Sequence, residues 1–195
     1  MIIDALEKTI QVKIVYYGPA MSGKTTSLRC LFDHFGKKFE SIESTVGRTL
    51  FFDYGTISFQ NEDWILKMHI YSTTGQDFYV VTRPITLQAI DGMIFVVDSQ
   101  RSAYNRDIIS WDELKVYFAD SLVKLPKVIA FNKQDLPDKF SHISFLEKID
   151  YSKYKNLDID FTIALNGEGI LQSFENILRL IFKDLYKKEL LSVVV

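Results

Sequence analysis

Residues 18–25 read Gly-Pro-Ala-Met-Ser-Gly-Lys-Thr and match G-x-x-x-x-G-K-[ST], the phosphate-binding P-loop. In such a loop several backbone N–H groups point at one phosphate, and the helix that follows adds the positive end of its dipole. We expect Lys24 to reach the outer phosphates and the Thr25 hydroxyl to hold Mg²⁺. The other residues expected to contact the nucleotide here are Gly18, Pro19, Ala20, Met21, Ser22, Gly23 and Thr26.

The segments on either side of this loop have the patterns that a P-loop needs. Residues 10–17 are largely apolar and alternate like a strand, and residues 25–35 can form a helix. Strand, glycine loop and helix in this order would place the loop N–H groups around an anion. The sequence therefore predicts a phosphate site and not an ordinary glycine turn.

A second motif, Asn132-Lys133-Gln134-Asp135, follows a predicted strand at residues 126–131. It matches N-K-x-D, the guanine-specificity motif of the Ras-like GTPases. The Asp135 carboxylate can accept hydrogen bonds from the ring N–H and the exocyclic amine of guanine, donors that adenine lacks. We expect Lys133 to lie along the base and Asn132 to tie loops together.

Two further segments resemble Ras-like motifs less completely. Residues 162–166 resemble the S-A-K-type loop, in which the Ala164 backbone N–H would contact the guanine carbonyl and Leu165 replaces the usual lysine. Gly75-Gln76 resembles the end of D-x-x-G-Q, in which the glycine N–H binds the γ-phosphate and the glutamine orients the attacking water. The aspartate position of that motif is Ser72, which leaves open what supports Mg²⁺ there.

Composition limits the classes of function open to the chain. Its 195 residues suggest one domain, and a hydrophobic content of 47% allows a substantial core. The net charge of −2 gives no electrostatic case for a nucleic-acid partner. The single cysteine, the lack of a long apolar run and the lack of a lipidation motif lead us to expect a cytoplasmic protein without its own membrane anchor.

Strand-like and helix-like segments alternate along the chain, which predicts an α/β fold with helices on both faces of a mostly parallel sheet. We expect the three-layer P-loop NTPase fold, with about six strands and one antiparallel edge strand. Residues 1–9 would be a short N-terminal extension and residues 186–195 a C-terminal tail. After the first strand, the other strands are predicted at residues 49–59, 64–71, 92–98, 126–131 and 159–163. Later helices are predicted near residues 108–118, at 143–149 and at 170–185. Residues 150–157 are expected to form a polar surface connection.

With these motifs the chain resembles a small GTPase of the Ras superfamily over residues 12–185. Residues 13–19, 22–26 and 48–53 are most similar to the MglA family of prokaryotic small GTPases, which carries threonine at the position of Ser72. Residues 92–99 and 132–135 also resemble Arf proteins. The resemblance implies a switch that binds GTP or GDP with Mg²⁺ and hydrolyses GTP slowly unless a partner accelerates it.

The resemblance also implies roles for residues near the nucleotide. Thr49 would close on Mg²⁺ and the γ-phosphate, and Arg48 would act as an arginine finger from within the chain. Thr45 is a rival for the switch threonine, since residues 45–47 look like the Arf pattern T-I-G. Thr49 lies 26 residues before Gly75, closer to typical Ras-like spacing than the 30 residues from Thr45. Asp53 is a candidate for the missing carboxylate near the metal.

The resemblance implies partners of a particular kind. We expect a GTPase-activating or effector protein, with a Roadblock-domain dimer as the candidate, a role in polarity, motility or trafficking, and a monomer when free. Two alternatives stay open. A nucleotide-binding scaffold with negligible turnover is suggested by Ser72 and Ala20, and an ATP-using P-loop enzyme is disfavoured by the motif ending at Asp135.

Overall fold

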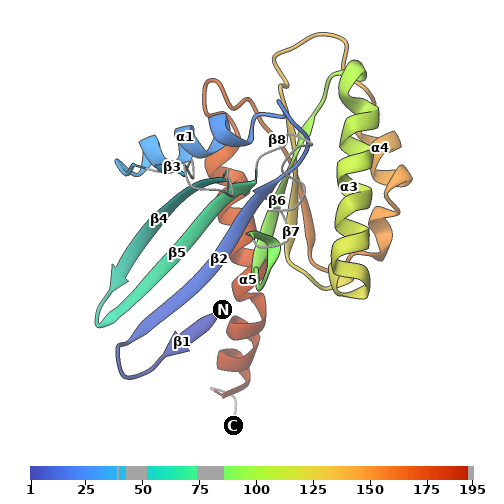
Figure 1. Ribbon diagram of the computed structural model, residues 1–195. Helices are drawn as coiled ribbons and strands as arrows, with labels where there is room; N and C mark the ends of the chain where they lie inside the picture. The colour runs from blue at the N-terminus through green and yellow to red at the C-terminus, as the bar shows by residue number, and fades with distance from the viewer. Residues whose placement is uncertain (39, 43–51, 74–85, 193–195) are drawn as a thin grey trace, which may run out of the picture.

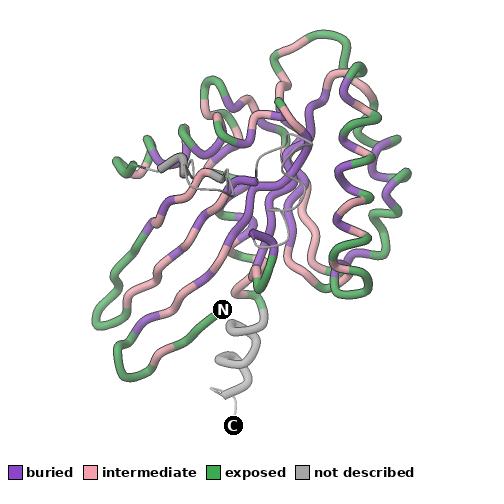
Figure 2. Tube along the Cα trace, in the orientation of Figure 1, coloured by how far each residue is buried: buried purple, intermediate pink, exposed green. Residues whose placement is uncertain are grey.

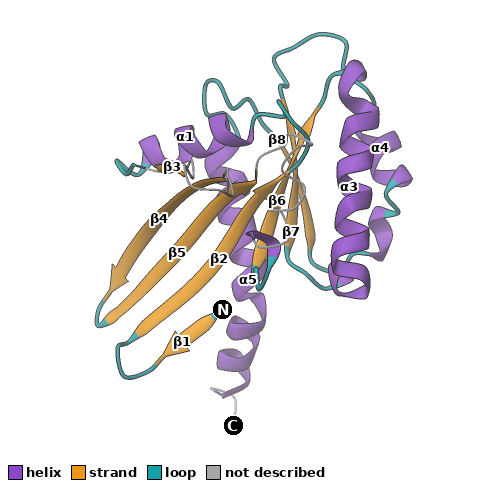
Figure 3. Cartoon of the chain, in the orientation of Figure 1, coloured by secondary structure: helices purple, strands orange, loops and turns teal. Residues whose placement is uncertain are grey.

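A single twisted sheet forms the centre of the molecule, with helices packed on both of its faces (Figure 1). The computed structural model describes residues 1–38, 40–42, 52–73 and 86–192. Within these residues the sheet has eight strands in the order β3-β4-β5-β2-β6-β7-β8, and β1 pairs with β2 beside this path. Figure 3 shows the strands as one layer between two layers of helix.

The elements follow one another in the alternating order that the sequence predicts. The strands are β1 (Ile2–Asp4), β2 (Thr9–Tyr17), β3 (Glu40–Ile42), β4 (Phe52–Asn61), β5 (Trp64–Thr73), β6 (Gly92–Asp98), β7 (Lys127–Asn132) and β8 (Leu157–Phe161). The α-helices are α1 (Lys24–His34), α3 (Tyr104–Phe118), α4 (His142–Lys148) and α5 (Ile170–Ser192). Short 3₁₀ segments are η2 (Arg101–Ala103), η3 (Ala119–Val123) and η4 (Tyr151–Lys153).

The predicted fold class is confirmed, and strand pairing adds detail to it. Strands β5, β2, β6, β7 and β8 run parallel, whereas β4 pairs antiparallel with β5 and β3 antiparallel with β4. Two short strands exceed the expected number. One of them, β1, forms an antiparallel hairpin with β2, so part of the predicted N-terminal extension belongs to the sheet.

Alternation along the parallel strands divides the buried side chains into two layers. On β2, Ile14 and Tyr16 face the layer under α1 and α5, whereas Val15 and Tyr17 face the layer under α3 and α4. Figure 2 shows the buried residues concentrated in the central strands, where both faces are covered. This burial on both faces explains why β6 reads as a continuous apolar run from Gly92 to Val97.

Two predicted boundaries and one predicted surface segment differ clearly from the structure. Strand β8 occupies residues 157–161 and not 159–163, because Ile163 no longer pairs with β7 and instead donates a 2.9 Å hydrogen bond to the Glu168 carbonyl. Helix α5 continues to Ser192, through most of the predicted tail. The predicted surface connection at 150–157 contains a buried residue, Tyr154, whose hydroxyl accepts a 3.2 Å hydrogen bond from the Trp111 indole N–H.

The parallel strands end at one edge of the sheet, and the predicted motifs follow those ends. The P-loop follows β2, Asp98 ends β6, Asn132 ends β7, and the loop containing Ala164 follows β8. Ligands of open α/β sheets bind at this edge. The fold therefore brings together motifs that are more than 100 residues apart in the sequence. None of the described helices is long and apolar enough to cross a membrane.

Candidate nucleotide-binding site

The P-loop backbone adopts conformations that depend on glycine at two positions. Gly18 and Gly23 have φ angles of 141° and 106°, a region that other residues rarely adopt. A Cβ on Gly18 would overlap the Val96 carbonyl oxygen, and a Cβ on Gly23 would overlap the Asn132 side-chain nitrogen. The two glycines therefore let the loop pack tightly against the ends of β6 and β7.

The side chains of this loop offer donors to an anion. Lys24 is buried, and its ammonium donates hydrogen bonds to the carbonyls of Gly18 (2.9 Å) and Pro19 (2.6 Å), so it lies folded back along the loop. The buried Ser22 hydroxyl has no hydrogen-bond partner among the described residues. These donors, in a loop that precedes a helix, fit a phosphate group.

Helix α1 adds to this anion site because its first turn lacks the groups that usually occupy a helix N-terminus. Its N-cap is Gly23, which has no side chain to bond the exposed N–H groups, and its first turn contains no acidic residue. The N–H groups at the start of α1 can thus bind a phosphate, favoured by the helix dipole. The loop and the helix together fit the phosphates of a nucleotide.

Asn132 joins the P-loop to the loop after β8, as the sequence predicts. Its side chain is 2% exposed and donates to the Ser22 carbonyl at 2.8 Å. Its side-chain oxygen accepts hydrogen bonds from the Thr162 hydroxyl (3.2 Å) and the Ala164 N–H (3.0 Å). A buried amide with these partners fixes three segments relative to one another.

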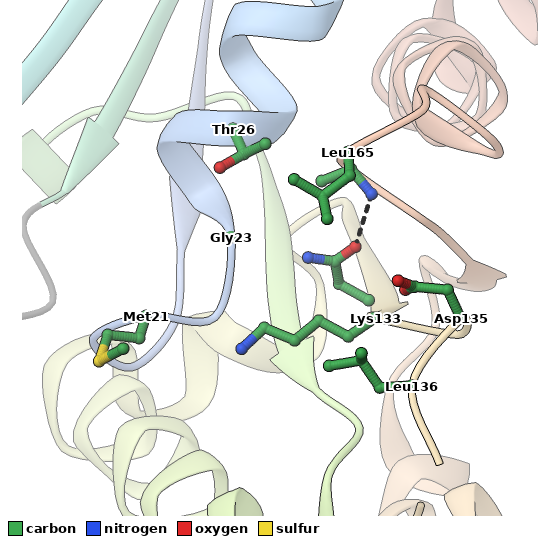
Figure 4. A pocket seen from close by; sticks show the side chains of 9 residues that line it. Met21, Gly23, Thr26, Lys133, Asp135, Leu136 and Leu165 are labelled. Carbon is green, nitrogen blue, oxygen red and sulfur yellow. Dashed lines mark hydrogen bonds between the residues drawn. The ribbon is translucent and has the colours of Figure 1, made fainter.

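A cavity of about 190 Å³ lies between the P-loop, the segment that begins with Asn132 and the loop after β8 (Figure 4). Figure 4 shows Lys133 extending across it toward Met21, with Asp135 and Leu165 on the other side. Residues of the P-loop, of the N-K-x-D motif and of the loop after β8 line it together: Met21, Gly23, Thr26, Asn132, Lys133, Asp135, Leu136, Ala164 and Leu165. This cavity combines the predicted phosphate and base motifs.

The Ala164 N–H has a different partner from the one that the sequence suggests. The prediction assigns this N–H to the carbonyl of guanine, whereas in the structure it donates to the Asn132 side-chain oxygen. Leu165, the next residue, is 83% exposed and forms part of the cavity wall. The Asn132 bond holds the loop in place and leaves Leu165 at the rim, where its apolar side chain can cover a ring.

A carboxylate lies beside the residue predicted to bind metal. The Thr25 hydroxyl donates a 2.7 Å hydrogen bond to the Asp53 carboxylate. Asp53 on β4 is the register partner of Ser72 on β5, so it occupies the neighbouring position to the one where Ras-like proteins carry an aspartate. Hydroxyl and carboxylate oxygens are ligands that suit Mg²⁺. Thr25 and Asp53 thus fit a metal that also binds phosphate oxygens.

Several predicted residues lie outside the described part of the chain. These are the proposed catalytic and switch residues Arg48, Thr49, Gly75 and Gln76, together with the rival Thr45. The structure adds one residue to the site that the sequence did not point to. This residue is the buried Asp98, whose carboxylate pairs with the Lys133 ammonium at 2.8 Å. The position of Asp98 at the carboxyl end of β6 was the signal that could have identified it.

The sequence matches the model of the Arf family, the ADP-ribosylation factor family, over residues 1–181. The chain belongs to this family. The resemblance to Ras-superfamily GTPases is therefore confirmed, and the Arf-family chain is a small GTPase, an enzyme that hydrolyses GTP. Such GTPases bind GTP and GDP, generally with Mg²⁺.

This Arf-family member is also similar to individual proteins with MglA and Rab names. It is 31% identical to the mutual gliding-motility protein MglA of Myxococcus xanthus, over 95% of this chain and 97% of the relative. It is 22% identical to the Ras-related protein Rab-11B of Dictyostelium discoideum, over 99% and 84% of the two chains. The Ras-related protein Rab-5B of Plasmodium falciparum is 26% identical over 86% and 76%.

A substitution at Gly23 tests whether the P-loop needs its close approach to Asn132. We expect Gly23→Ala to weaken GDP binding roughly 10- to 100-fold, because the new Cβ would strain the backbone and displace the Asn132 amide. Fluorescence titration with a labelled GDP measures the affinity.

Gly36→Ala is the matched control. Gly36 also has a positive φ (61°), but a Cβ there would meet nothing within 4 Å, so GDP affinity should stay within about twofold while stability falls slightly. Equal affinities for the two variants would contradict the assigned role of the Gly23 contact.

Proposed function

We propose that this Arf-family GTPase is a guanine-nucleotide switch whose GTP- and GDP-bound forms interact differently with partners. The observation that carries the proposal is the Asn132 bridge, which joins the phosphate-binding P-loop to the Ala164 loop around one cavity. Asp135 lines the same cavity. A nucleotide would then place its phosphates on residues 18–26 and its base beside residues 132–135 and 164–165.

Selectivity for guanine would come from Asp135. Its carboxylate can accept two hydrogen bonds from guanine, and adenine presents no such pair of donors. The stem of Lys133 and the side chain of Leu165 would cover the base. This chemistry favours GTP and GDP over ATP, so an ATP-using enzyme is the weaker alternative.

Mg²⁺ would be held by the Thr25 hydroxyl, with support from Asp53 and, in the GTP form, from Thr49. When bound, the ion would neutralise charge on the outer phosphates. Asp53 hydrogen-bonds Thr25 from the strand next to Ser72, which supports its role as the substitute carboxylate. The site would then keep an acidic group, but this group would lie on β4 at Asp53 and not on β5 at the position of Ser72.

Hydrolysis would be in-line attack of a water molecule on the γ-phosphate. Gln76 would orient that water, the Gly75 N–H would bind the γ-phosphate, and Lys24 would bind the outer phosphates. Arg48 would add a positive charge in the transition state, a contribution worth ~10³–10⁵ in rate where arginine fingers have been measured. The protein would act chiefly by positioning and by charge stabilisation.

The cellular role is proposed from the relatives. One of them is named a mutual gliding-motility protein, and others are Ras-related Rab proteins. We place this chain in the control of polarity, motility or trafficking, in the cytoplasm, through a GTPase-activating or effector protein such as a Roadblock-domain dimer. The free protein would be a monomer without a nucleic-acid partner.

Single-turnover hydrolysis tests the switch. Protein loaded with GTP should release phosphate at a rate on the order of 10⁻⁴ to 10⁻² s⁻¹, and Gln76→Leu should slow that release roughly tenfold or more by leaving the water unoriented. Gln60→Leu, an exposed glutamine on β4, is the matched control and should keep the wild-type rate. Equal and negligible rates in wild type and Gln76→Leu would favour the nucleotide-binding scaffold.

Substitution of Asp53 tests how the metal is supported. Mg²⁺ should slow GDP release, and the Mg²⁺ concentration at half of the maximal effect is the midpoint to measure. We expect Asp53→Asn to raise this midpoint roughly tenfold, because a carboxamide carries no negative charge to attract the ion. The control is Asp63→Asn in the same β4–β5 hairpin, since the Asp63 carboxylate is 74% exposed and pairs with Lys8. An unchanged Mg²⁺ midpoint in Asp53→Asn would exclude this role.

A further inference from the structure

An ion pair between the buried Asp98 and the partly exposed Lys133 lies beside the base cavity and involves no residue of the P-loop. The Lys133 ammonium is 2.8 Å from the Asp98 carboxylate, which is 2% exposed. Asp98 ends β6, and Asn132 on β7 is its register partner, so the sheet itself places this carboxylate next to the N-K-x-D motif. The pair thus links the end of β6 to the wall of the cavity.

The Asp98 carboxylate is held in place by its own surroundings. Its Oδ1 accepts a 3.2 Å hydrogen bond from the Gln100 N–H, and its backbone N–H donates to Asp107 Oδ1 at 3.1 Å. The Arg106 guanidinium is farther away, at 3.9 Å. A buried carboxylate requires a nearby cation, and Lys133 provides the shortest such contact that the described residues show.

Lys133 in turn lines the cavity along the length of its side chain. It has a left-handed backbone conformation (φ 64°), and Figure 4 shows its stem stretched from the β7 side toward the P-loop. A lysine stem is flexible and loses entropy when it is held straight. An anchor for its ammonium would reduce that cost at the moment a base binds.

We propose that Asp98 is a positioning residue for the base cavity: it holds the Lys133 ammonium so that the lysine stem forms a fixed surface for the nucleobase. The inference rests on the proposed function, since it takes the ligand to be a guanine nucleotide. Asp98 acts through Lys133 and does not touch the nucleotide. Its loss should therefore increase the rate of nucleotide release more than it changes the choice between bases.

A second buried carboxylate gives this anchor a dependence on pH. Asp107 on α3 is 0% exposed, and its Oδ2 has no hydrogen-bond partner among the described residues. Burial, with Asp98 close by, raises the pKa of Asp107 to about 8, although the Asp98 N–H, Arg106 and Lys133 act in the opposite direction. Asp107 is thus neutral at pH 7 and ionises above about pH 8, where its charge would compete with Asp98 for Lys133.

The test is a double-mutant cycle on the rate of GDP release at pH 7. Asp98→Asn and Lys133→Met should each accelerate release roughly 10- to 100-fold, and the double variant should be no faster than the faster single variant. If the two effects multiply, Asp98 does not act through Lys133 and the proposal fails. It also fails if Asp98→Asn releases GDP at the wild-type rate.

Asp138→Asn is the matched control for this cycle. Asp138 pairs with Arg101 at 2.8 Å, but its side chain is 75% exposed, so removing its charge should leave GDP release within about twofold of wild type. Thermal unfolding of each variant without nucleotide checks that the fold is kept. A wild-type protein that binds no GDP would overturn the proposed function, whereas normal binding with no coupling between Asp98 and Lys133 would overturn this inference alone.

The pH dependence of the GDP release rate tests the role of the Asp98–Lys133 pair even if Asp98→Asn fails to fold. Wild-type GDP release should accelerate several-fold between pH 7 and pH 9, as Asp107 ionises, and Asp107→Asn, which mimics the neutral carboxyl group, should lack that acceleration. The acceleration should also disappear in Lys133→Met, because it would act through the lysine. A pH profile that persists unchanged in both variants would overturn the proposal.

Discussion

The hydrogen bonds of one buried amide hold the candidate site together. Asn132 bonds the P-loop at Ser22 and the loop after β8 at Thr162 and Ala164, and a burial of 98% means that each unmade bond would leave a desolvated polar group. The fit is possible because Gly23 has no side chain where the amide nitrogen lies. This contact therefore holds the residues proposed to bind phosphate next to those proposed to bind the base.

Strand register supports the proposal that Asp53 takes the role of an acidic group at the position of Ser72. In an antiparallel pair, register partners lie side by side, and Asp53 is the partner of Ser72. The Asp53 carboxylate on β4 accepts a hydrogen bond from the Thr25 hydroxyl at 2.7 Å. In the proposed site, this carboxylate on the neighbouring strand would support the metal in place of an aspartate at position 72.

Much of the fold and of the site was predictable because the signals are local. Three features can each be recognised from ten or fewer consecutive residues. They are the glycine loop between a strand and a helix, the apolar run of β6 and the motif ending at Asp135. Contacts set by tertiary packing were not predictable to the same degree. The short strand β1 gains its stability from pairing with β2, the Asp98–Lys133 pair depends on the β6–β7 register, and the Thr25–Asp53 bond depends on how α1 meets β4.

We propose that the cavity between the P-loop and the N-K-x-D motif binds a guanine nucleotide through Asp135. Competition of GDP, ADP and xanthosine diphosphate against a labelled GDP, in wild type and in Asp135→Asn, tests this most directly. We expect wild type to prefer GDP over ADP by about 100-fold or more, and Asp135→Asn to weaken GDP and to bind xanthosine diphosphate better, since the base and the side chain exchange donor and acceptor. An unchanged base preference in the variant, or equal affinity of wild type for ADP and GDP, would contradict the claim.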